Sequence, residues 1–307
     1  MNVLAFGEIL WDIIEGQEHL GGAPFNFAAH AAQCGNSSFI ISRLGNDFLG
    51  TRAYNECRAY GVDNSLIQWH EELPTGIVDV TLEHGQPDYH IRKNVAYDFI
   101  EYDAVCSAFE KFTFDVFYYG TLVQRNGVSA STLKKILTEH QFRHIFYDVN
   151  LRKETFTEAI IRESLRHCTI LKLNVDEVPV LSKMLVGEDL IDEQFCAVVT
   201  ELFPNIKIVI ITAAEMGCYL YEDKKLTHVP GVPVSVTDAV GAGDAFSAAF
   251  MHVFSLTHDA KNAAALANQI GAFVAGKRGA VPEYSAHLKN ILTQGVKNMS
   301  NVSQNIL

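Results

Sequence analysis

The chain has 307 residues, 48% of them hydrophobic and 20% charged, a composition that permits one large α/β domain or two ordinary ones with a well-buried core. A net charge of -12 argues against a general affinity for nucleic acid or an anionic membrane surface, so anionic ligands must be held locally. The six cysteines are scattered without a C-x-x-C pair, and no segment approaches the roughly 18 uninterrupted apolar residues of a membrane span. These features predict a globular, cytoplasmic protein with reduced thiols.

Short apolar runs, mostly of β-branched or aromatic residues, predict buried strands at 3–10, 39–45, 114–120, 144–150, 169–174 and 207–212. Helix-like segments lie between them at 25–35, 50–61, 129–140 and 176–185. This alternation predicts a doubly wound, mostly parallel sheet flanked by helices, in a single domain over residues 1–307. In such sheets ligands collect at the carboxyl ends of the strands, where this sequence places Asn150, Asn174 and Thr212.

One stretch, residues 75–94, breaks this alternation because its apolar and polar residues alternate with period two. A turn at His84-Gly85-Gln86-Pro87 makes it a predicted hairpin. A hairpin inserted without a covering helix can be an edge extension, an oligomer contact or a lid over a site, and we favour a lid. The predicted lid insertion spans approximately 72–101 with part of 11–20, and its exposed edge makes a homodimer plausible.

The segment GGAPFNFAAHAAQCG, residues 21–35, combines two glycines and a proline with an alanine-rich helix, so its turn can approach a small ligand closely. Asn26 adds an amide that can both donate to and accept from a hydroxyl. Asp12, expected just after the first strand, could accept hydrogen bonds from neighbouring sugar hydroxyls. The alternatives are a packed turn and helix, and an ordinary exposed acid in a loop.

The segment TDAVGAGDAFSAAF, residues 237–250, predicts an anion site. Two glycines let backbone N–H groups converge, and a helix opening at Asp244 adds the positive end of its dipole. The carboxylate of Asp244 is then either a helix N-cap or a general base that accepts a hydroxyl proton during phosphoryl transfer. On the second interpretation, the backbone from Gly241 to Asp244 forms the anion hole, in which the N–H groups of Ala242, Gly243 and Asp244 hold the transferring phosphate beside that base.

Two other phosphate-binding patterns do not fit. GAFVAGKR, residues 271–278, nearly matches a P-loop, but Arg278 stands where a Ser or Thr would bind Mg²⁺, and the segment follows a helix instead of a strand. GAGDAF lacks the third glycine of the dinucleotide fingerprint and lies far from the first strand–helix unit. A nicotinamide-dependent dehydrogenase is therefore unsupported.

Together, GGAPFNFAAHAAQCG and DAVGAGDAFSAAF resemble the paired signatures of the ribokinase-like (phosphofructokinase-B type) carbohydrate kinases, over the first strand to roughly residue 285. Within that family the chain looks most like the fructokinases, because GGAPFN, the hairpin with VAYDFI, and DVNLR at 148–152 match their pattern. The resemblance implies ATP as phosphate donor, Mg²⁺ as the metal and a sugar as acceptor. Asp244 would be the base.

The resemblance also implies roles for single residues. The residues implied to bind the sugar are Asp12, Gly22, Asn26, Tyr89, Asn150 and Arg152. Those implied along the nucleotide are Asn174, Thr212, Gly217 and Asn268. Asn174 and Glu177 would organise Mg²⁺ through water, and Asp238, with the backbone near Gly279 and Ala280, falls where relatives hold a monovalent cation such as K⁺.

The chain departs from the family pattern at two alanines. Ala239 replaces a frequent threonine, and Ala214 replaces the first glycine of the nucleotide segment T-x-G-x-x-G, where an alanine restricts positive φ. The leading prediction is an ATP-dependent fructokinase. The alternatives are a kinase for ribose, 2-keto-3-deoxygluconate or a nucleoside, and a sugar- or nucleotide-binding regulator without turnover.

Overall fold

The computed structural model describes residues 1–14, 16–83, 86–153 and 155–293, with the backbone alone for 80–83 and 86–89. The chain divides into two compact units. Unit 1 comprises Met1–Ala29, Ser37–Arg143 and Leu151–Phe156, and unit 2 comprises His30–Asn36, His144–Asn150 and Thr157–Leu307. Helix α1, Ala23–Gln33, begins in unit 1 and ends in unit 2.

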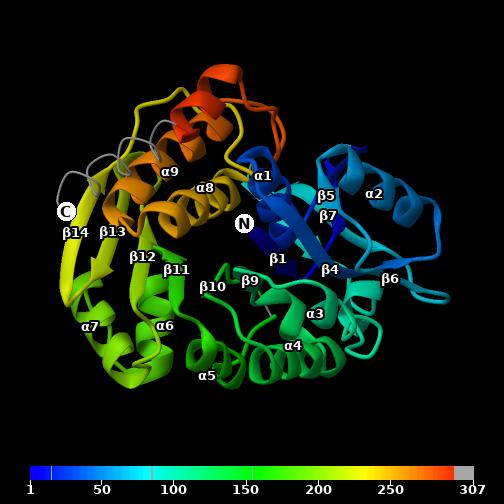
Figure 1. Cartoon of the computed structure of the whole chain (residues 1–307), viewed down its shortest axis with the longest axis horizontal. Helices are drawn as coiled ribbons and strands as arrows, with labels where there is room; N and C mark the ends of the chain where they lie inside the picture. Colours follow the sequence, from blue (N-terminus) through cyan, green and yellow to red (C-terminus); the bar gives the residue numbers. More distant parts are fainter. Residues whose placement is uncertain (15, 84–85, 154, 294–307) are drawn as a thin grey trace. The chain divides into compact units, whose positions relative to one another are not determined.

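Unit 1 is built on parallel strands in the order β9-β1-β4-β5, with β6 also paired to β4 (Figure 1). These strands are β1 (Asn2–Phe6), β4 (Ser37–Gly45), β5 (Val62–Asp63), β6 (Ile67–His70) and β9 (Val116–Gly120). Its other helices are α2 (Phe48–Ala59), α3 (Ala108–Lys111) and α4 (Gly127–Glu139). Every residue of β9 is buried, as expected for a strand covered on both faces.

The first predicted strand, 3–10, is in fact two strands. β1 ends at Phe6 and β2 (Leu10–Ile14) begins a second sheet. The break falls at Gly7, whose φ is +148° and where a Cβ would lie 2.5 Å from Cγ of Pro24. The chain therefore changes sheets at a glycine that packs directly against the start of α1.

The predicted hairpin is confirmed, because β7 (Gly76–Glu83) and β8 (Gln86–Ile91) pair antiparallel. Its turn includes residues 84 and 85, which lie outside the described part of the chain. The hairpin belongs to a four-stranded sheet in the order β3-β2-β7-β8, where β3 is Gln17–Gly21. β2 and β7 are parallel and place Leu10 opposite Gly76.

Unit 2 continues the alternation of strand and helix. Parallel β10, β11 and β12 are followed by antiparallel β13 and β14. The strands are β10 (His144–Asp148), β11 (Ile170–Asn174), β12 (Ile208–Thr212), β13 (Gly217–Glu222) and β14 (Lys225–Pro230). The helices are α5 (Glu158–His167), α6 (Glu177–Val186), α7 (Asp192–Leu202), α8 (Ala242–Thr257) and α9 (Ala260–Ala275). α8 and α9 pack side by side, and α9 also contacts β13 and β14 (Figure 1).

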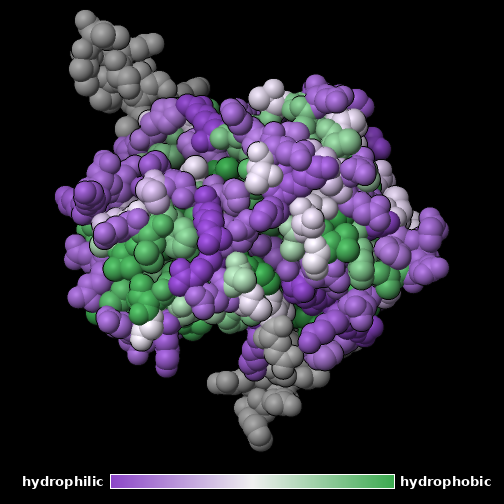
Figure 2. Space-filling model, turned by 90° about the horizontal axis from the view of Figure 1, so that it is seen from below, coloured by the Kyte–Doolittle hydropathy of each residue, from purple (hydrophilic) through white to green (hydrophobic). Residues whose placement is uncertain are grey.

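The predicted fold class, a mostly parallel sheet flanked by helices, is confirmed. Figure 2 shows a largely hydrophilic face that also carries separate areas of hydrophobic residues. Within the described ranges, none of the helices combines the length and the apolar character needed to cross a membrane. The six cysteines are free thiols, and all but Cys106 are buried.

Candidate active site

The predicted anion hole lies at the N-terminus of α8. Gly241 precedes this helix with φ +79°, and a Cβ there would contact the carbonyl oxygen of Ala280 and lie 2.7 Å from its Cα. Only glycine fits this position. The helix begins at Ala242, two residues earlier than predicted, so Asp244 lies within the first turn and is not the N-cap. Because the first N–H groups of a helix have no intrahelical acceptor, this end can bind an anion.

A buried ion pair lies behind this end of α8. Lys172 of β11 donates from Nζ to Oδ2 of Asp148 at 2.7 Å, and both side chains are buried. A Cβ placed on Gly243 would lie 3.4 Å from the same Nζ atom. Ser247 links the ion pair to the first turn of α8, since its hydroxyl donates to the Gly243 carbonyl at 2.9 Å and to Asp148 at 3.4 Å.

Burial alone would lower the pKa of Lys172, but Asp148, Asp244 and Glu177 together hold the pKa above its ordinary value. The ammonium is therefore charged and lies close to the anion hole. Lys172 is absent from the predicted site residues. The signal in the sequence was a lysine inside the apolar run TILKLN, because a charged side chain in a fully buried strand requires a partner.

Asn174 and Glu177, the predicted Mg²⁺ residues, stabilise the start of α6. Oδ1 of Asn174 accepts from the backbone N of Asp176 at 2.9 Å and of Glu177 at 3.0 Å. Oε2 of Glu177 accepts from the backbone N of Asn174 at 2.8 Å, so the two residues bond reciprocally across the turn that leads into α6. Glu177 is buried, and a carboxylate with an amide oxygen is a donor set that suits Mg²⁺, which keeps most of its waters.

The predicted nucleotide residues lie around the β12–β13 connection and α9. Thr212 ends β12 opposite Cys218, and Gly217 begins β13 with φ +93°, where a side chain would contact the backbone of Val229 and Gly231. Asn268 of α9 donates from Nδ2 to the carbonyls of Val229 and Pro230, both at 3.1 Å. Asn268 therefore holds the end of β14, whatever its part in nucleotide binding.

The alanine at position 214 adopts the conformation that the family's glycine would favour. Ala214 has φ +46° and begins a single 3-10 turn, Ala214–Met216, before Gly217. A left-handed backbone costs an L-residue roughly 1–2 kcal/mol. The turn is thus formed without its glycine, at the expense of local strain.

Asp238 joins the two loops beside the anion hole. Its Oδ1 accepts from the backbone N of Val240 at 3.0 Å, and its Oδ2 accepts from the backbone N of Gly279 at 3.1 Å. Each carboxylate oxygen keeps a second lone pair, so the group remains compatible with a monovalent cation. Among the residues that the structure describes, no three His, Cys, Asp or Glu side chains form a group that could hold a metal ion.

The predicted sugar residues of unit 1 lie around β2 and the start of α1. Asp12 is a half-buried residue of β2 and not a loop acid, because β2 forms the second sheet directly after Gly7. Burial raises the pKa of Asp12 to about 6, although Arg152 and His19 both lower it. A Cβ on Gly21 would lie 2.5 Å from Oδ2 of Asp12, so glycine leaves this carboxylate its space.

Gly22 has φ +107°, and a Cβ there would contact the backbone carbonyl of Glu8. The backbone N of Asn26 donates to the Gly22 carbonyl at 2.9 Å, and the Asn26 side chain is buried. Asn150 has a left-handed φ of +38° and belongs to unit 2. The backbone of Tyr89 pairs with Val80 in the hairpin, and its side chain lies outside the described part of the chain.

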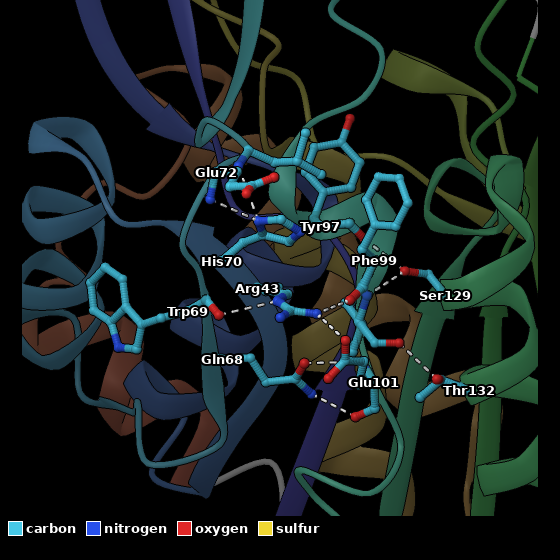
Figure 3. A network of polar contacts seen from close by, with 12 residues as sticks. Arg43, Gln68, Trp69, His70, Glu72, Tyr97, Phe99, Glu101, Ser129 and Thr132 are labelled. Carbon is cyan, nitrogen blue, oxygen red and sulfur yellow. Dashed lines mark hydrogen bonds and ion pairs between the residues drawn. The ribbon is translucent and has the colours of Figure 1, made fainter.

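Both ends of the hairpin are anchored within unit 1. At its start, Thr75 donates from its backbone N to Oδ2 of Asp47 and from its hydroxyl to Oδ1, both at 2.8 Å. Beyond its end, Arg43 donates to the carbonyl of Phe99 at 2.6 Å, and Gln68 exchanges two hydrogen bonds with the Glu101 backbone (Figure 3). The segments before and after the hairpin are therefore both held in place by hydrogen bonds within unit 1.

Comparison with known proteins places the chain in a family. The model of the pfkB family carbohydrate kinases matches residues 4–286. An uncharacterized sugar kinase of Pyrococcus horikoshii is 28% identical over 303 residues, which cover 91% of each chain, and fructokinase-2 of Oryza sativa subsp. japonica is 25% identical over 91% of this chain and 90% of its own.

Solved structures agree with this assignment. The Pyrococcus horikoshii sugar kinase in complex with ATP has a TM-score of 0.83, with 24% identity over 97% of this chain and all of its own. Fructokinase from Xylella fastidiosa with bound ATP has a TM-score of 0.85, with 21% identity over 95% of this chain and 98% of its own. The chain belongs to the pfkB family of carbohydrate kinases, and it is therefore an enzyme.

Proposed function

We propose that this protein is an ATP-dependent fructokinase that transfers the γ-phosphoryl group of ATP to the primary hydroxyl of the sugar. The observation that carries the proposal is the position of Asp244 in the first turn of α8, three residues after Gly241, which no other residue could replace. The similarity to named fructokinases and to sugar kinases with bound ATP supports both the donor and the acceptor.

In the proposed reaction, the carboxylate of Asp244 accepts the proton of the attacking hydroxyl. The new bond forms between that oxygen and the γ-phosphorus, while the bond from the γ-phosphorus to the bridging oxygen breaks and ADP leaves. The backbone N–H groups of Ala242, Gly243 and Asp244 bind the charge on the transferring group. A buried, charged Lys172 behind Gly243 strengthens this site, since a fixed cation in a low-dielectric environment needs no reorganisation.

The remaining predicted residues would bind the metal, the nucleotide and the sugar. Asn174 and Glu177 would hold Mg²⁺ through water, and Mg²⁺ would neutralise phosphate charge when bound. Thr212 and Gly217 would lie along the nucleotide. Asp12, Asn26 and Arg152 of unit 1 would bind the sugar hydroxyls, while the hairpin would exclude water and so limit wasteful hydrolysis of ATP.

A monovalent cation at Asp238 is proposed from the family resemblance and from the free lone pairs of its carboxylate. Potassium would then stabilise the two loops that Asp238 already joins. Turnover in potassium salts that exceeds turnover in tetramethylammonium salts at equal ionic strength is the expected result, and equal rates would remove the cation from the proposal.

The test is release of ADP from Mg·ATP in the presence of fructose, ribose, glucose, 2-keto-3-deoxygluconate or adenosine. We expect turnover with fructose, lost by several orders of magnitude in Asp244→Asn, which keeps the shape of the side chain and removes the base. Asp189→Asn, at an exposed position, is the matched control and should retain activity. Turnover with another acceptor alone would replace fructose in the proposal, and binding of ATP without any turnover would favour a regulator.

A further inference from the structure

The loop of residues 279–284 forms the support of the anion hole in unit 2. Ala280 packs so closely against Gly241 that a single Cβ would not fit between them. The neighbouring Gly279 donates its backbone N–H to Asp238, whose other carboxylate oxygen accepts from Val240. The position of the first turn of α8 therefore depends on the position of this loop.

The C-terminal part of α1 holds the same loop from its other side. His30 places Nε2 2.9 Å from the carbonyl oxygen of Ala280 and Nδ1 2.8 Å from the hydroxyl of Tyr284. Gln33, one turn further on, donates to the carbonyl of Pro282 at 3.1 Å and accepts from the backbone N of Tyr284 at 2.7 Å. His30 and Tyr284 are 0% and 2% exposed, so water cannot replace these bonds.

Chemistry fixes the tautomer of His30. A carbonyl oxygen can only accept, so Nε2 must carry the proton and Nδ1 must accept from the hydroxyl of Tyr284. Burial lowers the pKa of His30 to about 4, and the imidazole is neutral at physiological pH. One neutral ring thus donates to Ala280 and accepts from Tyr284, which no aliphatic side chain or ionised carboxylate could do.

We propose that His30 is a positioning residue for phosphoryl transfer, acting through Ala280 on the backbone of Gly241 and the anion hole. The proposal rests on the function proposed above for that hole. His30 does not touch the reacting groups. Its contribution is orientation, and a displacement of about 1 Å in such a site can cost roughly 100-fold in rate.

A role in packing alone would also explain a buried histidine, so the experiment must separate the two. The variants are His30→Ala and Tyr284→Phe, which removes only the hydroxyl. The matched control is His252→Ala, because His252 is a partly buried histidine of α8 whose Nδ1 contacts Asn36 and not the 279–284 loop. For each variant we would measure Tm, kcat, and the KM values for fructose and ATP.

The expected result is a loss of about ten- to hundredfold in kcat for His30→Ala, with KM for fructose within about threefold of the wild-type value. Tyr284→Phe should show a smaller loss in the same direction. His252→Ala should lose stability and keep its kcat per folded molecule. If the His30 and Tyr284 variants lose only stability, as the control does, the positioning role is wrong.

A second measurement does not require turnover. In protein labelled with [¹⁵N]glycine, the amide resonances of Gly241 and Gly243 should shift in both His30→Ala and Tyr284→Phe, and should not shift in His252→Ala. Unchanged resonances in the two variants would overturn the inference even if Tm falls. If the wild-type protein turns over no acceptor while these resonances still shift, the proposed kinase activity fails and the coupling from His30 to the anion hole stands.

Discussion

The Nζ atom of Lys172 lies 2.7 Å from Oδ2 of Asp148, and the two buried side chains belong to neighbouring parallel strands, β11 and β10. The pair is therefore a part of the sheet itself, beneath the turn that carries Asp244. Its energetic importance is asymmetric, because removal of one partner leaves an uncompensated charge in the interior. This asymmetry allows structure and catalysis to be separated by mutation.

Substitution Lys172→Met should destabilise the protein by about 3–5 kcal/mol, because Asp148 loses its buried counter-ion. The activity of the remaining folded protein should also fall, since the anion hole loses a nearby positive charge. Urea unfolding gives the first quantity and kcat at saturating ATP gives the second.

The double variant Lys172→Met/Asp148→Leu is the control, because it removes both charges. It should recover much of the stability and none of the turnover. Recovery of turnover together with stability would show that Lys172 serves the fold alone.

Asp12 predicts a dependence of sugar binding on pH. Its pKa is raised to about 6 by burial, so the carboxylate becomes protonated as the pH falls below that value and accepts fewer hydrogen bonds. The kcat/KM for fructose should therefore decline below about pH 6 in the wild type. In Asp12→Asn it should be low and independent of pH between 5 and 7.5, and an equal decline in both proteins would assign the titration to another group.

The same pKa shift predicts how stability depends on pH. The pKa of Asp12 is higher in the folded protein than the ordinary value of 3.8 that holds in the unfolded chain. The folded state therefore loses stability as the pH rises from 3.8 to about 6. The change in the free energy of unfolding that Asp12→Asn causes, relative to the wild type, should therefore be more stabilising at pH 7 than at pH 4. Thermal unfolding at the two pH values measures the difference.

Substitution Ala214→Gly should stabilise the protein by about 0.5–1 kcal/mol, because glycine relieves the left-handed φ of +46° at a small entropic cost in the unfolded chain. Ala213→Gly is the matched control, since Ala213 has an ordinary φ of -132° and should only suffer the entropic cost. Chemical denaturation of both variants tests the strain. Equal destabilisation by the two glycines would contradict it.

The anchored ends of the hairpin predict where motion occurs. Hydrogen exchange at the amides of Gly76–Glu83 should slow when fructose and ADP are added, because a lid closes over bound ligand. The amides of residues 97–101, held by Arg43, Gln68 and Ser129, should be protected in both states. Unchanged exchange throughout 76–91 would argue that the hairpin is a fixed edge of the sheet.

The elements themselves followed largely from local pattern. The buried strands at 114–120, 144–150, 169–174 and 207–212 were predicted within a few residues, because runs of β-branched and aromatic side chains have few alternatives in a covered sheet. The hairpin followed from its period of two. Two of the boundaries that differ from the prediction lie at glycines, namely the end of β1 before Gly7 and the start of α8 after Gly241, where contacts with Pro24 and Ala280 decide the backbone.

By itself, the sequence determined the order of strands and helices, the glycine-rich turn before Asp244 and the resemblance to one family of kinases, because each is a property of neighbouring residues. Tertiary structure alone decided that Lys172 pairs with Asp148, 24 residues away, and that His30 reaches Ala280, 250 residues away. The physical reason is that periodicity and turn chemistry act over a few residues. A buried charge or imidazole is satisfied by whichever partner the packed fold brings within about 3 Å.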